Sequence, residues 1–389
     1  MSLFVVPRAG RRARALLLAP VLLAGCEKGG RPQAEALHGV FRPTRLATSP
    51  SSADLMGVIG LDVDSRGNVY VADRSSRLFV FSPDGAVLRT LGRKGQGPGE
   101  FDLLADVRVL PRDSVFAFDA GLSRVTVFGP NSDRAAYSVN VGTNAMLYPY
   151  WVRTAVSTRG IFAAYRAAFG EGDGRGPRGH RKEVLRLLNP DGSIRRDSVL
   201  AFDEAEMLLL HGAVEGVTEN PFGRQTIFAL GGDDRVYAAW TGALAIAVYS
   251  ADGRPVRTIR PAIAAAARPI TAHDRDSVIA ALGNAVPAAV LRRAFAEIGS
   301  DSWPLFRDML VDDADRVWLG LLGGHGDPVR WTAFDQAGAQ VASLELPENV
   351  SLRVVRGRRA YGVELDEDDV PRVVVYALEP VRTAPARGA

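Results

Sequence analysis

The sequence predicts an all-β fold: a six-bladed β-propeller of four-stranded antiparallel blades, closed by an N-terminal strand and carrying a short helical insertion. A phrase that begins at Gly60, GLDVDSRGNVYVADRSSRLFVFSPDGAVLRTLG, recurs in six copies, of which the later ones are weaker. Each copy contains four short runs of strand-forming residues, separated by turn signals such as RGN and PDG. The shortest intervals between copies are close to the roughly 40–45 residue period of four-stranded propeller blades.

The first element along the chain is a leader. Its first fourteen residues hold four arginines and no acidic residue, and the apolar run ALLLAPVLLAG follows. This layout predicts a secretory signal over residues 1–25, because the run is about half the length that spans a bilayer. The run ends in Leu23-Ala24-Gly25-Cys26, which resembles the bacterial lipobox, and the resemblance implies that Cys26 is lipidated. The alternative is an ordinary secretory signal with a coincidental cysteine.

The domain boundaries follow from composition. Residues 26–38 are polar and suit a tether, residues 39–380 form the propeller, and residues 381–389 are a tail. Cys26 is the single cysteine of the chain, so the fold is held by its core without an internal disulfide. We therefore expect an exported protein that is lipid-anchored in the bacterial cell envelope, on the periplasmic or outer-membrane face, with the membrane as one partner.

The charge balance of the mature chain gives no reason to expect a nucleic-acid partner. The whole chain has 47 Lys and Arg against 44 Asp and Glu, and four of the arginines lie in the leader. Their removal leaves 43 basic against 44 acidic residues. A nearly neutral protein has no global attraction for a polyanion.

The innermost strand of each blade is expected to begin near one residue per copy: Leu61, Val107, Val152, Ile227, Met309 and Leu352. The sixth copy stops after its third strand, which would leave an open edge that proteins normally cover. We predict that residues 39–49, GVFRPTRLATS, supply the missing outer strand and close the ring.

The pattern G-L-x-V-D-x-x-G-N-x-Y-V-x-D…R-L-x-V-F-x-x-D-G resembles an NHL repeat, and GRKGQGPGEF (Gly92 to Phe101) resembles the link between consecutive NHL blades. The match is close over residues 57–130 and weaker beyond. The whole layout resembles the lipid-anchored six-bladed propeller proteins of bacterial envelopes. This resemblance implies a ring with a central channel and a binding face, and it implies no enzyme activity.

Loop lengths distinguish the two rims of the predicted ring. The turns between the first and second strands, and between the third and fourth, are short in every copy. The long segments fall on the opposite rim: 92–101, 166–182, 203–224, 261–304 and 323–328. Loops displayed on a rigid scaffold usually carry recognition, so this rim is the expected binding face, although drift also lengthens loops.

The longest insertion, residues 261–304, is expected to be helical. One helix should cover about Asp274 to Leu282, and a second should begin at Pro287. Leu291, Ala294, Phe295 and Ile298 give this second helix one apolar stripe. In one interpretation the stripe faces the propeller, and the insertion is a lid packed on the rim. In the other, the insertion is a cap over the channel or a docking helix for a partner.

Two Asp–Arg pairs occupy matching places after the second strand of the first two copies: Asp73 with Arg77, and Asp119 with Arg124. They form either ion pairs that brace a loop or a polar ring that grips an anionic or hydroxylated ligand. Arg224 and His325, on the long-loop rim, are further candidate ligand-binding residues. We expect no cofactor and no metal site, because the histidines lack ligand spacing.

These features favour a binding module that recognises an unknown protein, peptide or glycan. An enzyme, a lyase or hydrolase at the channel mouth, is the first alternative, and a metal at His180, His211 or His325 would favour it. Peptidyl-hydroxyglycine lyases resemble this fold and use such a metal. The second alternative is a structural envelope protein without a small ligand.

Overall fold

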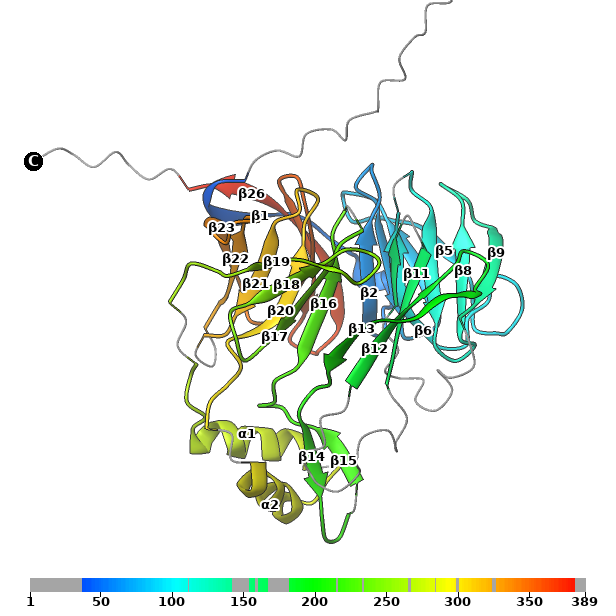
Figure 1. Cartoon of the computed structure of the whole chain (residues 1–389). Helices are drawn as coiled ribbons and strands as arrows, with labels where there is room; N and C mark the ends of the chain where they lie inside the picture. The colour runs from blue at the N-terminus through cyan, green and yellow to red at the C-terminus, as the bar shows by residue number, and fades with distance from the viewer. Residues whose placement is uncertain are drawn as a thin grey trace, which may run out of the picture. The chain divides into compact units, whose positions relative to one another are not determined.

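The computed structural model describes residues 37–381 apart from 111, 142–153, 158–159, 167–181, 215, 233, 265–266, 284, 299–300 and 324–326. The described residues form six four-stranded units and one separate hairpin. Consecutive strands within each unit pair antiparallel, and the predicted six-bladed β-propeller is confirmed (Figure 1).

Each blade takes its strands from one copy of the repeated phrase. Blade 1 contains β2 (Val58–Val63), β3 (Val69–Asp73), β4 (Arg77–Phe81) and β5 (Val87–Leu91). Blade 2 contains β6 (Leu104–Val109), β7 (Val115–Asp119), β8 (Arg124–Phe128) and β9 (Ala135–Asn140). Blade 3 contains β10 (Thr154–Ser157), β11 (Gly160–Arg166), β12 (Lys182–Leu188) and β13 (Ile194–Asp203). Blade 4 contains β16 (Thr226–Leu230), β17 (Val236–Trp240), β18 (Ile246–Tyr249) and β19 (Pro255–Ile259). Blade 5 contains β20 (Phe306–Val311), β21 (Val317–Leu321), β22 (Val329–Phe334) and β23 (Gln340–Leu346). Blade 6 contains β24 (Val350–Arg356), β25 (Arg359–Leu365), β26 (Pro371–Pro380) and β1 (Gly39–Thr48).

Six clusters of buried apolar side chains hold the blades together, one cluster between each pair of neighbours. Tyr70 of blade 1 packs with Phe128 of blade 2 in one of them. Tyr361 of blade 6 packs with Phe81 of blade 1 in another, so the first and last blades are joined. Burying an aromatic side chain of this size stabilises the fold by roughly 1.5–3 kcal/mol. The contact between the first and last blades therefore rests on side-chain packing rather than on a continuous ladder of backbone hydrogen bonds.

The N-terminal strand closes the ring as predicted. β1 pairs antiparallel with β26, from Phe41 opposite Pro380 to Thr48 opposite Val374. Its first three residues also pair in parallel with β23 of blade 5, which joins blades 5 and 6 into one sheet. A 3₁₀ turn, Ser51–Ala53 (η1), then leads into blade 1.

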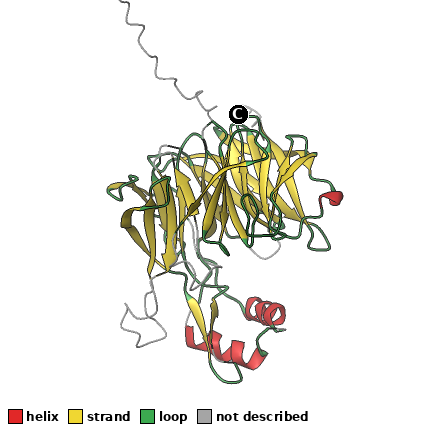
Figure 2. Ribbon diagram, turned by 90° about the vertical axis from the view of Figure 1, so that its right-hand side faces the viewer, coloured by secondary structure: helices red, strands yellow, loops and turns green. Residues whose placement is uncertain are grey.

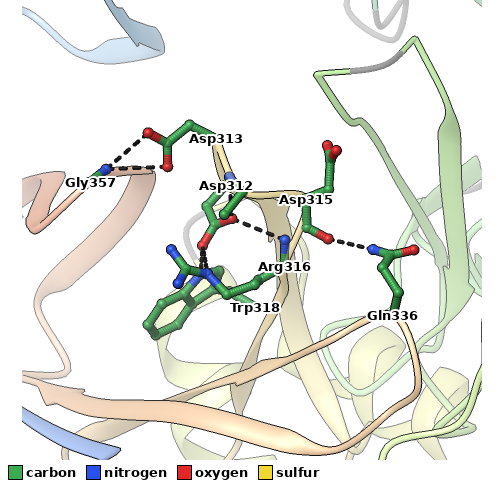
Figure 3. A network of polar contacts seen from close by, with 8 residues as sticks. Asp312, Asp313, Asp315, Arg316, Trp318, Gln336 and Gly357 are labelled. Atoms are coloured by element: carbon green, nitrogen blue, oxygen red, sulfur yellow. Dashed lines mark hydrogen bonds and ion pairs between the residues drawn. The ribbon is translucent and has the colours of Figure 1, made fainter. Parts of the chain in front are cut away.

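The two rims of the ring differ in construction. On one rim, which we call the turn rim, tight turns join the first strand of a blade to the second and the third to the fourth. Neighbouring turns bond to each other: Asp113 accepts from the Ser65 N–H at 2.8 Å, and Asp313 accepts from the Gly357 N–H at 3.1 Å (Figure 3). Within one turn, buried Asp312 accepts from Trp318 Nε1 at 2.7 Å. On the turn rim, these polar groups therefore form hydrogen bonds with one another.

The other rim, which we call the loop rim, carries the long connections. The segment before blade 4, expected to be a loop, contains a hairpin of β14 (Met207–Leu210) and β15 (Gly216–Glu219). The segment after blade 4 contains α1 (Ala272–Leu282) and α2 (Ala288–Ile298), close to the predicted helices (Figure 2). We call the hairpin and helices together the insertion module.

The apolar stripe of α2 packs inside the insertion module. Leu291 and Phe295 lie in one cluster with Leu208 of β14, with Phe222 and with Ile279 of α1. The expectation that the stripe packs on the propeller is wrong, because a strand segment from a different connection covers it. Two insertions far apart in the sequence share one core.

Candidate functional site

Asp73 ends β3 with its side chain fully buried. Its Oδ2 accepts from the backbone N–H groups of Met56 and Gly57, both at 2.9 Å, and its Oδ1 accepts from the Ser75 N–H at 2.8 Å. Arg77 lies opposite Asp73 on β4, but its Nε donates to Ser75 Oγ at 2.9 Å and its guanidinium covers the Phe79 ring. The carboxylate therefore braces backbone rather than the neighbouring arginine.

Asp119 repeats this arrangement at the end of β7. Its carboxylate is fully buried and accepts from the N–H groups of Asp102, Leu103 and Leu122, at 2.6, 3.1 and 2.9 Å. Each aspartate thus ties the loop after its strand to the chain that enters the same blade. The paired positions recognised in the sequence are equivalent, and both lie on the loop rim.

Arg124, the partner that the spacing gave to Asp119, holds the link between blades 1 and 2. Its Nη1 donates to the Gln96 carbonyl and its Nη2 to the Gly97 carbonyl, both at 3.1 Å. The same link is fixed by Glu100, whose pKa is lowered by the hydrogen bond from the Gly97 N–H and by Arg93. The glycine-rich segment is therefore an ordered loop that Arg124 positions.

A shallow, open hollow of about 470 Å³ lies beside Arg124. It is lined by Gln96 and Pro98 of the link and by residues of the outer strand β9, including Tyr137, whose side chain is 48% exposed. The hollow combines a guanidinium, an aromatic ring and hydroxyl and amide groups. Such a lining suits a peptide or a hydroxylated ligand.

Arg224 lies where the insertion module joins the ring. Its Nη2 donates to Ser302 Oγ at 3.1 Å, and its Nη1 lies 3.6 Å from Glu206 Oε2. Arg224 therefore ties the chain of the hairpin to the chain that follows α2. This is a structural joint, whose remaining surface is partly exposed.

Thr241, in the loop after β17, is a residue that the sequence analysis missed. It is 1% exposed, its Oγ1 accepts from the Gln225 N–H at 3.0 Å, and its carbonyl accepts from the Leu305 N–H at 2.8 Å. Gln225 and Leu305 are the points at which the two insertions re-enter the ring. One residue of blade 4 thus holds the roots of both insertions, one through its side chain and one through its backbone carbonyl, and a lone threonine in a loop gives no sequence signal for this role.

The core of the insertion module also contains a cation–aromatic stack. Arg268 lies over the Trp303 ring at 4.6 Å and forms two hydrogen bonds to Asp274, at 3.1 and 3.3 Å. Trp303 meets Phe222 of the hairpin edge-on, with ring centroids 4.8 Å apart. Burial acts to raise the pKa of Asp274, but hydrogen bonds from Thr271 and Arg268 outweigh it and lower the pKa to about 2. These contacts make the module an ordered element of the loop rim.

Three predicted positions lie outside the described residues: Cys26, His180 and His325. His211 is exposed at the tip of the β14–β15 hairpin. Among the residues that the structure describes, no group of three His, Cys, Asp or Glu side chains could hold a metal ion. In the same part of the chain no helix has the length and apolar character needed to cross a bilayer.

Comparison with known proteins supports the fold. The family DUF5128, described as a 6-bladed beta-propeller, matches residues 52–134, which cover blade 1 and the first three strands of blade 2. No curated protein matches the chain.

Several solved structures are similar to this chain at low identity. A putative exported protein from Bacteroides fragilis is 12% identical, with a TM-score of 0.46 over 88% of this chain and 99% of the other. A member of the duf4221 family from Bacteroides vulgatus is 9% identical, with a TM-score of 0.45 over 89% and 98%. Virginiamycin B lyase from Staphylococcus aureus is 10% identical, with a TM-score of 0.37 over 88% and 90%.

Proposed function

We propose that this protein is an exported, lipid-anchored binding module of the cell envelope, and that it recognises a protein, peptide or glycan through its loop rim. The observation that carries the proposal is the insertion module. Two connections that are separate in the sequence build one ordered core on one rim, and Thr241 and Arg224 fix it there. Drift alone lengthens loops but does not give them a shared core.

The opposite rim supports the same conclusion. Turn-rim carboxylates are engaged by neighbouring turns, as in the bonds from Ser65 to Asp113, from Gly232 to Asp315 and from Gly357 to Asp313. A surface whose polar groups bond to each other has fewer of them left for a partner. The loop rim, by contrast, offers the exposed Met56, whose side chain is 69% exposed, and the hollow beside Arg124 lies along the outer strand β9.

The position of the first strand suits an anchor at Cys26. Gly39 lies next to Ala342 at the start of β23, and both strands begin at the turn rim. A tether that ends at Gly39 therefore joins the ring at the rim opposite the insertion module. Export and lipidation are proposed from the leader sequence, and mass spectrometry of the mature N-terminus tests them: we expect an acylated Cys26, and an unmodified residue at that position contradicts the anchor.

Site-specific photo-cross-linking of the full chain in intact cells tests the binding face. A photoreactive residue replaces exposed loop-rim residues, Met56 or Arg292 of α2, or exposed turn-rim residues, Arg66 or Ala337. We expect ultraviolet light to produce discrete adducts from the loop-rim positions alone. Equal adducts from both rims, or adducts from the turn rim alone, overturn the proposal.

A further inference from the structure

The innermost strands of the six blades surround the ring axis. β2, β6, β10, β16, β20 and β24 contact one another in this order, and β24 contacts β2 again. Both faces of every blade pack on neighbours, and the second strand covers the outer edge of each innermost strand. An exposed side chain on one of these strands therefore faces the axis.

Four of the innermost strands carry a β-bulge, which follows the first residue pair with the second strand in blades 1, 2 and 5 and the third pair in blade 6. The register against the second strand shifts between Val58 and Gly60, between Leu104 and Asp106, between Phe306 and Asp308, and between Leu352 and Val354. The extra residues are Ile59, Ala105, Arg307 and Arg353. A bulge bends its strand and re-aims a side chain, and it recurs beside functional sites. In blades 5 and 6 the re-aimed side chain is an arginine.

Charged groups from blades 1 and 2 face the same axis. Asp106 lies 3.2 Å from Arg108 Nε, and both oxygens of Asp62 accept backbone N–H groups, from Val63 and Val109, at 2.8 Å. Arg108 lies on an innermost strand, and 44% of its side chain is accessible to water, as expected for the lining of a lumen. Desolvation raises the pKa of Asp106, and Asp106 in turn raises the pKa of Arg108, which stays charged.

Of these charged side chains, Arg353 has the fewest hydrogen-bond and ion-pair partners. It is exposed, and within the described residues it has neither a hydrogen bond nor an ion pair. It lies within electrostatic reach of Asp106, two blades away across the axis. Arg108 pairs with Asp106 through its Nε. Within the described part of the chain, guanidinium N–H groups of Arg353 and Arg108 are thus left over on the innermost strands.

We propose that Arg353, with Arg108, binds the carboxylate of a ligand on the ring axis, a site separate from the loop rim. The guanidinium fork matches a carboxylate in shape and charge. Asp62 and Asp106 lie within electrostatic reach of Arg108, so two carboxylates balance the two guanidinium groups and disfavour a dianion such as phosphate. The same aspartates accept hydrogen bonds from hydroxyl or amide groups next to the carboxylate. An acidic sugar and the C-terminus of a peptide share this chemistry.

Isothermal titration of the full chain with small probes tests the site. The probes are glucuronate, N-acetyl-alanyl-alanine, glucose and inorganic phosphate. We expect one of the two carboxylates to bind, and the one that binds identifies the source of the carboxylate; glucose and phosphate should bind at least tenfold more weakly. A failure of both carboxylates to bind, or preferred binding of phosphate, overturns the proposal.

Variants locate the binding. Arg353→Gln should weaken carboxylate binding about tenfold or more, since a charged hydrogen bond is lost. Arg257→Gln, on the outer strand β19 where Arg257 is exposed, is the matched control and should bind like the native protein. If Arg353→Gln does not fold, Arg353→Lys keeps the charge but not the fork, and should weaken binding less. Equal affinity of the Arg353 and Arg257 variants contradicts the site, and neither result depends on cross-linking at the loop rim.

Discussion

Asp119 occupies the same place in blade 2 as Asp73 in blade 1, and each accepts three backbone N–H groups without bonding to the arginine opposite or nearby in sequence. Each carboxylate joins the entry of its blade to the loop after the second strand. Since an ionised carboxylate accepts on both oxygens, it satisfies more donors than a neutral side chain of this size. The loop rim of the first two blades is therefore pre-organised by two buried charges.

Replacement of Asp73 by asparagine should destabilise the protein markedly. The amide offers one acceptor oxygen in place of two, and its NH₂ then faces backbone donors that are buried. We expect a loss of about 2–4 kcal/mol in the free energy of unfolding, measured by urea denaturation.

The control for this prediction is Asp133→Asn, because Asp133 is 71% exposed in a turn and pairs only with Arg89. It should change the free energy by less than about 0.5 kcal/mol. Equal stability of the two variants would show that Asp73 is not a brace.

Gly60 should not tolerate a side chain. A Cβ on Gly60 would lie 2.7 Å from Asp106 Oδ1 and 2.9 Å from the backbone nitrogen of Val107, and backbone cannot move aside cheaply. Gly60→Ala should therefore cost about 1–3 kcal/mol, because it separates the innermost strands of blades 1 and 2. Gly216→Ala, where a Cβ meets nothing within 4 Å, should be nearly neutral when both variants are compared by urea denaturation. A neutral Gly60→Ala variant contradicts this close approach.

The insertion module should lose stability in acid. The folded pKa of Asp274 is about 2, below its ordinary value of 3.8, so the folded state binds fewer protons than the unfolded state. The stabilisation is complete above about pH 4 and is lost as the pH falls towards 2. It amounts to about 1–2 kcal/mol, with allowance for solvent screening near the surface.

Hydrogen exchange of the α1 amides between pH 5 and pH 2.5 measures this effect after correction for intrinsic rates. Native protection should fall with pH, and Asp274→Asn should be weakly protected throughout. Asp276→Asn, two residues further along α1 and exposed, should keep the native profile. Protection in the native protein that does not change with pH contradicts the role of Asp274.

The sequence was sufficient where local signals and global packing agree. The PDG and QAG turns predicted hairpins, and Gly85 and Gly338 adopt φ of 89° there, a conformation that favours glycine. An added Cβ at either position would also meet the outer strand that precedes it in the ring, at Thr48 O or Arg260 O. The missing fourth strand of blade 6 was predictable because an uncovered edge is unfavourable.

The features that the sequence did not predict depend on contacts between residues far apart in the chain. Met207–Leu210 is too short an apolar run to predict a strand, and it becomes one because α2 covers it. The bulges at Arg307 and Arg353 leave the apolar pattern of β20 and β24 nearly unchanged, so only the register reveals them. The spacing of Asp73 and Arg77 predicted that the two residues lie opposite each other on neighbouring strands. It did not predict that the Asp73 carboxylate accepts its hydrogen bonds from backbone N–H groups.

The ring closed by β1 is the claim on which both proposed sites depend, and an engineered disulfide tests it most directly. Arg42 of β1 lies opposite Glu379 of β26. Directly opposed residues in antiparallel strands have the separation that a disulfide needs. In a Cys26→Ser chain with cysteines at positions 42 and 379, mild oxidation should form a reducible cross-link between the two peptides in nearly all molecules. Two thiols that stay free and fully reactive in the folded protein would contradict closure by the N-terminal strand.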